Sequence, residues 1–244
     1  MSALGHYLEE AGIASVAIAL IRPQAEHTRP PRALWVPFEL GRPIGPPGDA
    51  PFQRRVILAA LGMLEADNGP VLLQDFADDD PREAPDAAWR PPIPPADGVE
   101  SLEAGVLADL VDAELRALAP AYAKSCTERA RSTVGLLGAP PAAAADYVTA
   151  WLRGEQPQSL AADMSPILSL RFAVDDIKAF ALEAALAGGG QPSSQQQGDW
   201  FWNETATGAA IRRLRRTLLT DEDERAKLIA TMFMVPALRI PPGG

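Results

Sequence analysis

The fold is decided by residues 8–55, which read LEEAGIASVAIALIRPQAEHTRPPRALWVPFELGRPIGPPGDAPFQRR. The run Ser15–Ile21 carries no charge, which is typical of a strand buried on both faces in a parallel sheet covered by helices. Ala33–Phe38 is a second strand candidate, and Pro37 places it near an edge or at a strand end. Pro51–Ala66 has apolar residues at helical spacing, and Asp49 is expected to cap this helix. These elements are typical of an α/β unit.

The flanking residues extend this unit and then end it. Residues 4–11 predict a short helix that stops at Gly12, the crossover 22–31 is too short for a full helix, and Val71–Phe76 predicts a third strand. Residues 77–100 are acidic and rich in proline, so we expect a linker or an extended arm there. Trp89 should anchor this arm on a folded surface, because an exposed indole would leave a large apolar area in water.

The remainder of the chain has the apolar periodicity of helices. The predicted helices cover Leu102–Leu118, Tyr122–Leu137, Ala142–Leu152, Ser165–Ala187, Trp200–Leu219 and Thr220–Met234, with a low-complexity loop at 188–198. The expected fold class is therefore α/β (α+β), with a small, mainly parallel sheet at the N-terminus and a larger helical portion. We expect the boundaries to be 1–76, 77–100 and 101–244, with the helical portion packed on the first as one unit.

Composition excludes several classes of protein. The net charge of −10 disfavours nucleic acid, since a polyanion would be repelled. The longest uncharged apolar run, residues 13–21, is too short to cross a membrane and follows two glutamates, so neither a membrane span nor a signal peptide is expected. The single cysteine, Cys126, cannot form an intrachain disulfide. We expect a cytoplasmic protein.

A family resemblance rests on the order LEEAGI, a strand-like run, VPFELGRPIGPP, and a proline-initiated helix that carries Arg54 and Arg55. In these motifs, roughly residues 4–65, the chain resembles the carboxy-terminal part of the selenoprotein B family. That family comprises the catalytic subunits of glycine, sarcosine and betaine reductases and their D-proline relatives. Its members carry a selenocysteine or cysteine with a second cysteine nearby, upstream of this stretch, whereas this sequence contains one cysteine in total. The resemblance therefore implies a related protein without the redox pair.

The loop that carries the resemblance contains the first candidate site. Its glycines match neither the dinucleotide fingerprint nor the Walker pattern, and its prolines remove the backbone donors that a phosphate needs. Arg42, Arg54 and Arg55, with Glu39, are candidates to bind an amino-acid-like ligand, because arginine grips a carboxylate in bidentate fashion. The alternative is that these arginines are solvated residues at a helix start.

Cys126 and the two histidines give no catalytic or metal site. A catalytic thiol needs a base or a resolving partner, and the nearest histidine in sequence is His27. Cys126 is therefore expected to be structural, and a single-thiol enzyme is the weakest hypothesis. His6 and His27 lack the spacing of a specific metal site. We expect no catalytic residue, metal or cofactor.

The densest aromatic cluster is DWFWNET at residues 199–205. Trp200, Phe201, Trp202 and Glu204 are candidates for a pocket or a partner surface, because tryptophan combines a large apolar area with a polar N–H. The alternative is that the rings fill the core. The next residues, IRRLRRTLL, place four arginines around a helix that could face the acidic arm at 77–100.

Two function hypotheses follow. The first is a non-redox accessory or binding subunit related to selenoprotein B. The sequence leaves open whether this subunit takes part in an enzyme, and we do not expect it to be catalytic alone. It would bind a small amino-acid-like ligand, a catalytic partner subunit or a second copy of itself. The alternative is a helical protein–protein interaction module with no ligand chemistry.

Overall fold

The computed structural model describes residues 2–66, 69, 71–81 and 84–240. Two compact units make up the chain, Met1–Ala84 and Pro85–Gly244, and each is described by itself. The N-terminal unit holds the sheet and the C-terminal unit is helical, so the predicted fold class is confirmed. Whether the two pack as one unit stays a prediction.

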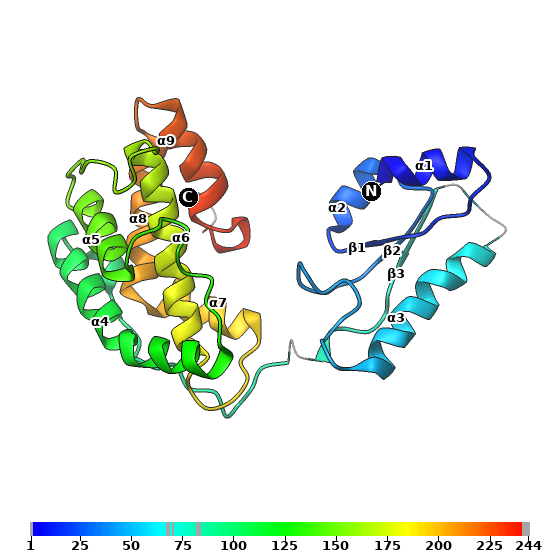
Figure 1. Ribbon diagram of the computed structural model, residues 1–244, viewed down its shortest axis with the longest axis horizontal. Coiled ribbons are helices and arrows are strands. Elements are labelled where there is room, and N and C mark those ends of the chain that lie inside the picture. Colours follow the sequence, from blue (N-terminus) through cyan, green and yellow to red (C-terminus); the bar gives the residue numbers. More distant parts are fainter. Residues whose placement is uncertain (1, 67–68, 70, 82–83, 241–244) are drawn as a thin grey trace. The chain divides into compact units, whose positions relative to one another are not determined.

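The N-terminal unit is a three-stranded parallel sheet with helices (Figure 1). Its strands follow the order β1-β2-β3, with Ala17 opposite Ala33 and Arg32 opposite Leu72. In chain order the elements are α1 (Ser2–Glu10), β1 (Ala17–Ala19), α2 (Arg22–Thr28), β2 (Arg32–Trp35), α3 (Ala50–Gly62), a 3₁₀ turn (Met63–Glu65) and β3 (Leu72–Asp75).

The central strand β2 is covered on both faces. Leu34 and Val36 pack in a core with Phe52 and Val56 of α3, while the guanidinium of Arg22 in α2 lies over the ring of Trp35, 5.9 Å from its centroid. Because successive residues of a strand point to opposite faces, α2 and α3 lie on opposite faces of the sheet.

The crossover between β1 and β2 differs from its prediction. It forms the seven-residue helix α2, with proline in the first turn, where its missing N–H costs nothing. Arg29 ends this helix in the left-handed conformation, with φ of 46°. The sequence analysis expected no full helix because the crossover is short, but seven residues are enough for the two turns of α2.

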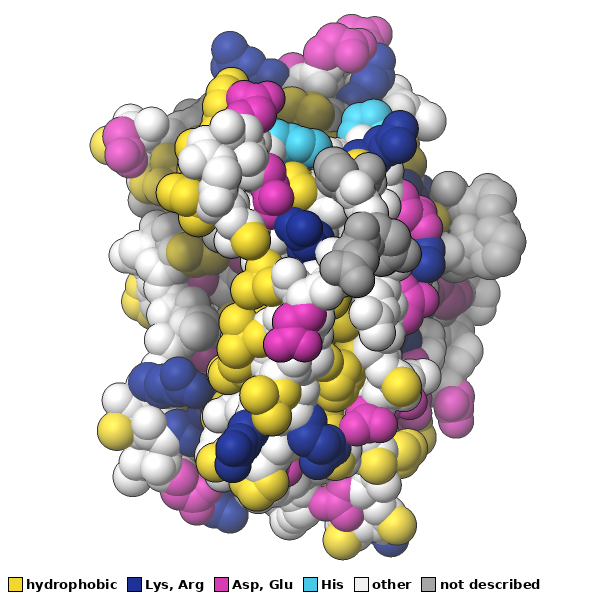
Figure 2. Space-filling view, turned by 90° about the vertical axis from the view of Figure 1, so that its right-hand side faces the viewer, with side chains coloured by type: hydrophobic (Ala, Val, Ile, Leu, Met, Phe, Trp, Pro, Cys, Tyr) yellow, Lys and Arg dark blue, Asp and Glu magenta, His cyan; other side chains and the backbone are white. Residues whose placement is uncertain are grey.

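The helix α3 begins as predicted, because the carboxylate of Asp49 accepts a hydrogen bond from the Phe52 backbone N–H at 3.0 Å. Its outward side also stays partly hydrophobic, since Ile57, Leu58 and Leu61 are exposed. Figure 2, which faces the side of the molecule that lies to the right in Figure 1, shows hydrophobic side chains gathered along the middle of this surface. The α3 helix is therefore apolar on more than its core side.

The loop between β2 and α3 needs glycine at Gly45. Its φ is 88°, and a Cβ built there would lie 2.4 Å from the ring of Phe52. Phe38, Phe52 and Phe76 form a cluster of rings with centroids 5.5 to 6.1 Å apart beneath this loop. The loop is therefore held against the core by the aromatic cluster.

The C-terminal unit packs its helices around a second core, to which α4, α5, α6, α7 and α8 all contribute (Figure 1). In chain order the elements are a 3₁₀ turn (Val99–Ser101), α4 (Ala104–Arg129), α5 (Pro141–Leu152), α6 (Pro166–Ala185), α7 (Ser194–Glu204), α8 (Ala206–Leu219), α9 (Glu224–Ile229), a π-helical turn (Ala230–Met234) and a 3₁₀ turn (Ala237–Arg239). Among the residues that the structure describes, no helix is both long and apolar enough to cross a membrane.

Residues 85–100 of the predicted arm belong to the helical unit. Trp89 is buried there, edge to face with Trp200, so its predicted role as an anchor is confirmed. Asp86 accepts hydrogen bonds from the backbone N–H groups of Gln191 and Ala88 at 2.6 and 2.8 Å, and these lower its pKa. At the end of the arm, Glu100 pairs with Arg212 and Arg216 of α8, so the arginine helix does face this acidic segment.

Candidate functional site

A cavity of about 260 Å³ lies at the carboxyl ends of β2 and β3. This is the edge at which parallel α/β sheets bind ligands, because the loops that leave the strands gather there. Leu34 and Ala59 contribute apolar surface, and Phe76 a ring. The charged lining comes from Arg55 of α3 and from Asp75 and Asp78 at the end of β3 and just after it, and Gln74 adds an uncharged polar group. The cavity therefore combines an aromatic and aliphatic lining with both signs of charge.

Arg55 is the predicted ligand residue that the structure places at this cavity. Its guanidinium lies over the Phe52 ring at 4.9 Å and pairs with the Asp78 carboxylate at 3.0 Å. The two side chains are 55% and 52% exposed. An ion pair exposed to this degree is worth about 0–1 kcal/mol, so a ligand can open it at little cost.

Asp75 lies on the same rim and pairs with an arginine of another helix. Its carboxylate accepts a hydrogen bond from the Nε of Arg22 at 3.2 Å. This hydrogen bond and the charge of Asp75 raise the pKa of the Arg22 guanidinium. The pair joins α2 to the end of β3, whereas Asp78 pairs with Arg55 of α3, so each carboxylate on this rim has an arginine partner.

The other three predicted residues of this group lie elsewhere. Arg42 is near the chain's own acids, with its Nη1 3.5 Å from Glu39 and 3.9 Å from Asp80, whose side chain is fully buried. Arg54 is exposed, one residue before Arg55 on α3. Of the four predicted residues, only Arg55 lines the cavity as the structure describes it.

Sequence reasoning missed Asp75, Asp78 and Phe76. A signal for them was present, because they end or follow the third predicted strand and loops at strand ends gather at one edge of a parallel sheet. The acidic run was interpreted only as the start of the arm. The contact between Arg55 and Asp78 spans 23 residues and depends on the parallel pairing of β2 with β3.

The aromatic candidates lie in the core of the helical unit. Trp200, Phe201 and Trp202 are 1%, 1% and 5% exposed, and the last two meet edge to face at 4.9 Å. Rings buried to this degree offer no free face to a partner. Glu204 is half-buried, and its carbonyl oxygen accepts a hydrogen bond from the Ala96 N–H at 2.7 Å.

Phe201 and Trp202 also line a cavity of about 400 Å³. The charged groups of this cavity are already bound within the chain: Lys178 pairs with Asp175 at 2.7 Å, and Glu183 accepts a hydrogen bond from the Thr133 N–H at 2.6 Å. Burial acts to raise the pKa of Glu183, but the hydrogen bonds from Thr133 and Ser132 and the charge of Arg129 together outweigh it, and the pKa is lowered. The cavity is therefore large enough for a small molecule, but its described charged groups are already paired within the chain.

Cys126 is half-buried on α4. Burial raises the pKa of the neighbouring Tyr122 hydroxyl; a hydrogen bond with Ser132 opposes this shift, and the nearby Cys126 adds to it. A tyrosine with a raised pKa is a poor base at neutral pH, so it does not activate the thiol. Across the described ranges, no group of three His, Cys, Asp or Glu side chains is placed to hold a metal.

No protein-family model, curated protein or solved structure matches this chain.

Proposed function

We propose that this chain is a non-redox binding subunit related to the selenoprotein B family, and that it binds a small amino-acid-like zwitterion at the carboxyl ends of β2 and β3. Two features support the proposal. One is the resemblance of residues 4–65 to that family, and the other is the chemistry of the cavity beside Arg55. The first supports the class of ligand, and the second supports the choice of this cavity for it.

The single observation that carries the proposal is the exposed pair of Arg55 and Asp78 on the rim. A zwitterion has the same two charges as this pair. Its carboxylate replaces Asp78 beside the Arg55 guanidinium, with bidentate geometry, and its ammonium group takes the place of Arg55 beside Asp78. Opening the pair costs little, because both partners are in contact with water.

Phe76 gives the site a preference for methylated amines. An N-methylated ammonium is weakly hydrated and stabilised by the face of an aromatic ring, by about 0.5–2 kcal/mol. Phe76 and Leu34 line the same cavity as Arg55. We therefore expect glycine betaine and sarcosine to bind more tightly than glycine.

The proposed subunit acts without a redox pair. Its sequence contains one cysteine, Cys126, which belongs to the helical unit and not to the unit with the cavity. Thiol-based reduction needs a second group to resolve the oxidised intermediate. In this proposal a separate chain supplies the reductive chemistry and the present chain presents the ligand.

Titration calorimetry with glycine betaine, sarcosine, glycine and D-proline tests the proposal. We expect dissociation constants on the order of 1 mM or below for the methylated ligands, equivalent to about −4 kcal/mol. Arg55→Gln and Asp78→Asn should each weaken binding about tenfold, which corresponds to about 1.4 kcal/mol. Both residues are exposed, so circular dichroism should show an unchanged fold.

The matched controls are Arg54→Gln and Asp79→Asn, which make the same chemical changes at exposed neighbours. These controls should bind as the unmodified protein does. Equal weakening by Arg54→Gln and Arg55→Gln would show a general charge effect and not a site. The absence of binding by all four ligands would remove the proposed function.

A further inference from the structure

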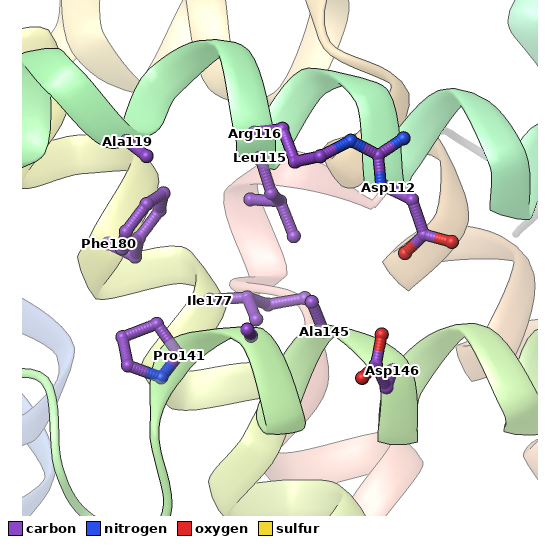
Figure 3. A pocket seen from close by; sticks show the side chains of 10 residues that line it. Asp112, Leu115, Arg116, Ala119, Pro141, Ala145, Asp146, Ile177 and Phe180 are labelled. Atoms are coloured by element: carbon purple, nitrogen blue, oxygen red, sulfur yellow. The ribbon is translucent and has the colours of Figure 1, made fainter.

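The helical unit contains a cavity of its own, between α4, α5 and α6, with a volume of about 310 Å³ (Figure 3). This size falls in the range of small-molecule sites, about 300–1,000 Å³. None of its lining residues takes part in the proposed function. The cavity therefore requires its own explanation.

One end of the cavity is apolar. Leu115, Ile177 and Phe180 are buried core residues of α4 and α6 that also line it. In Figure 3 Phe180 lies near Ala119 and Pro141, with no charged group among them. A ligand would place a hydrocarbon or aromatic group at this end, because removal of apolar surface from water is favourable.

The other end carries three charged groups, Asp112 and Arg116 on α4 and Asp146 on α5. Figure 3 shows the carboxyl groups of Asp112 and Asp146 turned toward one another, with the Arg116 side chain extending along α4 toward Asp112. The polar and apolar ends of the cavity are thus separate. This arrangement fits a ligand that is charged at one end only.

The three charges are not equally available. Asp112 lies 3.6 Å from Arg153, which is also bound to Asp109 at 2.7 Å. Arg116 and Asp146 have no ion pair or side-chain hydrogen bond within the described part of the chain. The cavity therefore presents one available cation and one available anion, on facing helices.

We propose that this cavity is a binding site for an α-amino acid with a large apolar side chain. Its carboxylate lies at Arg116, its ammonium group at Asp146, and its side chain on Leu115, Ile177 and Phe180. A simple fatty acid would leave Asp146 without a partner, and a simple amine would leave Arg116 without one. A ligand with both groups next to an apolar side chain matches both charges and the apolar end.

Calorimetric titration of the full chain with L-leucine and L-phenylalanine tests the site. Each should bind, and three probes that lack one feature should bind at least tenfold more weakly: 3-methylbutylamine without the carboxylate, 4-methylpentanoate without the ammonium group, and glycine without the side chain. Arg116→Gln and Asp146→Asn should each weaken leucine binding about tenfold or more, and both are exposed positions at which the fold tolerates change.

A third variant tests the cavity itself. Ala142 is exposed and lines the cavity, so Ala142→Phe should fill the apolar end from the rim and abolish leucine binding without a buried substitution. The matched controls are Arg131→Gln and Asp163→Asn, at exposed positions of the same unit outside this cavity, and they should leave binding unchanged.

The proposal is overturned if neither amino acid binds, if 3-methylbutylamine binds as tightly as leucine, or if leucine binding survives in Arg116→Gln, Asp146→Asn and Ala142→Phe. These outcomes are separable from those of the betaine titration, because Arg55→Gln and Asp78→Asn alter the other unit and should leave leucine binding intact. Weakening of leucine binding by Arg55→Gln instead of Arg116→Gln would assign it to the site on the sheet.

Discussion

The indole N–H of Trp89 donates a hydrogen bond to the carbonyl oxygen of Ala185 at 3.1 Å, in the buried core of the helical unit. Ala185 is the last residue of α6, and the carbonyl groups in the last turn of a helix lack partners within the helix. The proline-rich segment thus caps α6. Just beyond the helix, Lys124 donates a hydrogen bond to the Ala187 carbonyl at 3.0 Å.

We expect two substitutions of Trp89 to destabilise the helical unit to different degrees. Trp89→Phe keeps most of the ring but leaves a buried carbonyl without its donor, at a cost of about 1–3 kcal/mol. Trp89→Ala also removes the contact with Trp200 and should cost about 3–5 kcal/mol. Urea unfolding followed by circular dichroism measures both. If Trp89→Ala unfolded at the same urea concentration as the unmodified protein, the segment would not be anchored.

Glu114 makes the stability of the helical unit depend on pH. Its buried carboxylate, on α4, accepts hydrogen bonds from the Ala206 and Thr207 backbone N–H groups at 2.7 and 3.0 Å, and from the Thr207 hydroxyl at 2.5 Å. Burial raises its pKa above the usual 4.5, and these hydrogen bonds offset the rise only in part. The folded state therefore binds the proton more tightly than the unfolded state does.

For an acid whose pKa is raised on folding, the stabilisation is fully present below the unfolded pKa and is lost as pH rises through the folded pKa. The free energy of unfolding of the unmodified protein should therefore increase, relative to Glu114→Gln, as pH falls from 8 toward 4.5. Asp86 and Glu183, whose lowered pKa values act in the opposite direction, are common to both proteins and cancel in the difference. A difference that stays constant between these pH values would contradict the assignment to Glu114.

Asp176 holds the loop between α4 and α5. It is 1% exposed, and its two oxygens accept hydrogen bonds from the backbone N–H groups of Gly135, Leu136 and Leu137 at 2.8, 2.9 and 3.1 Å. An amide in place of the carboxylate turns one acceptor into a donor that faces an N–H. Asp176→Asn should therefore lower the free energy of unfolding by about 1–3 kcal/mol.

The neighbouring residue supplies the control for this prediction. Asp175 pairs with Lys178 at 2.7 Å and lies 3.9 Å from Arg171, but its side chain is 22% exposed and makes no hydrogen bond to the described residues of the loop, so Asp175→Asn should cost less than Asp176→Asn. Thermal melts of the two variants give the comparison. Similar destabilisation by both would show that the loss of a negative charge on α6 matters, and not the three loop hydrogen bonds.

Helices and strands were predictable where one local sequence signal was enough to identify them. Asp49 as N-cap and the three short strands are in this class. The predicted helices Leu102–Leu118 and Tyr122–Leu137 leave a gap around Pro120, and an interior proline usually breaks a helix, at about 3 kcal/mol. The structure continues α4 through Pro120. Residues before and after it, Leu118 and Ser125, are buried, so packing on both sides outweighs the local penalty.

At residues 188–205 the prediction failed in the opposite way, because a helix start was missed and two helices were predicted as one. The low complexity of residues 188–198 predicted a loop, yet Ser193 and Gln196 form a capping box that starts α7, a signal readable from the S-x-x-Q spacing. Thr205 then ends α7 and caps α8 through a hydrogen bond from the Gly208 N–H at 2.9 Å, where one continuous helix was expected.

The candidate site on the sheet was predictable only in part, because charges find their partners through the tertiary fold. Arg55 was identified from its place at a helix start after the glycine-rich loop, but its partner Asp78 lies beyond the third strand. Arg42, in the glycine-rich loop before the helix, was grouped with Arg55, yet the fold places it beside Glu39 and Asp80. Sequence spacing does not distinguish these two arginines.

The last prediction concerns reduction by the chain itself. Reductive cleavage of an amino-acid C–N bond by a thiol or selenol, the chemistry that the family resemblance implies, needs a nucleophile and a group that resolves the oxidised intermediate. The chain has one cysteine, which cannot form an internal disulfide. We expect no amine release and no substrate loss when the purified chain is incubated with glycine, sarcosine, betaine or D-proline and dithiothreitol.

Dithiothreitol makes this assay demanding, because it can resolve an intermediate formed on a single thiol. Cys126→Ala therefore serves as the matched variant. Turnover above a no-protein control that disappears in Cys126→Ala would identify a single-thiol enzyme and refute the non-redox assignment. Turnover that is equal in both proteins, and that persists after further purification, would show reductive chemistry without cysteine and would remove the reason to expect a separate redox chain.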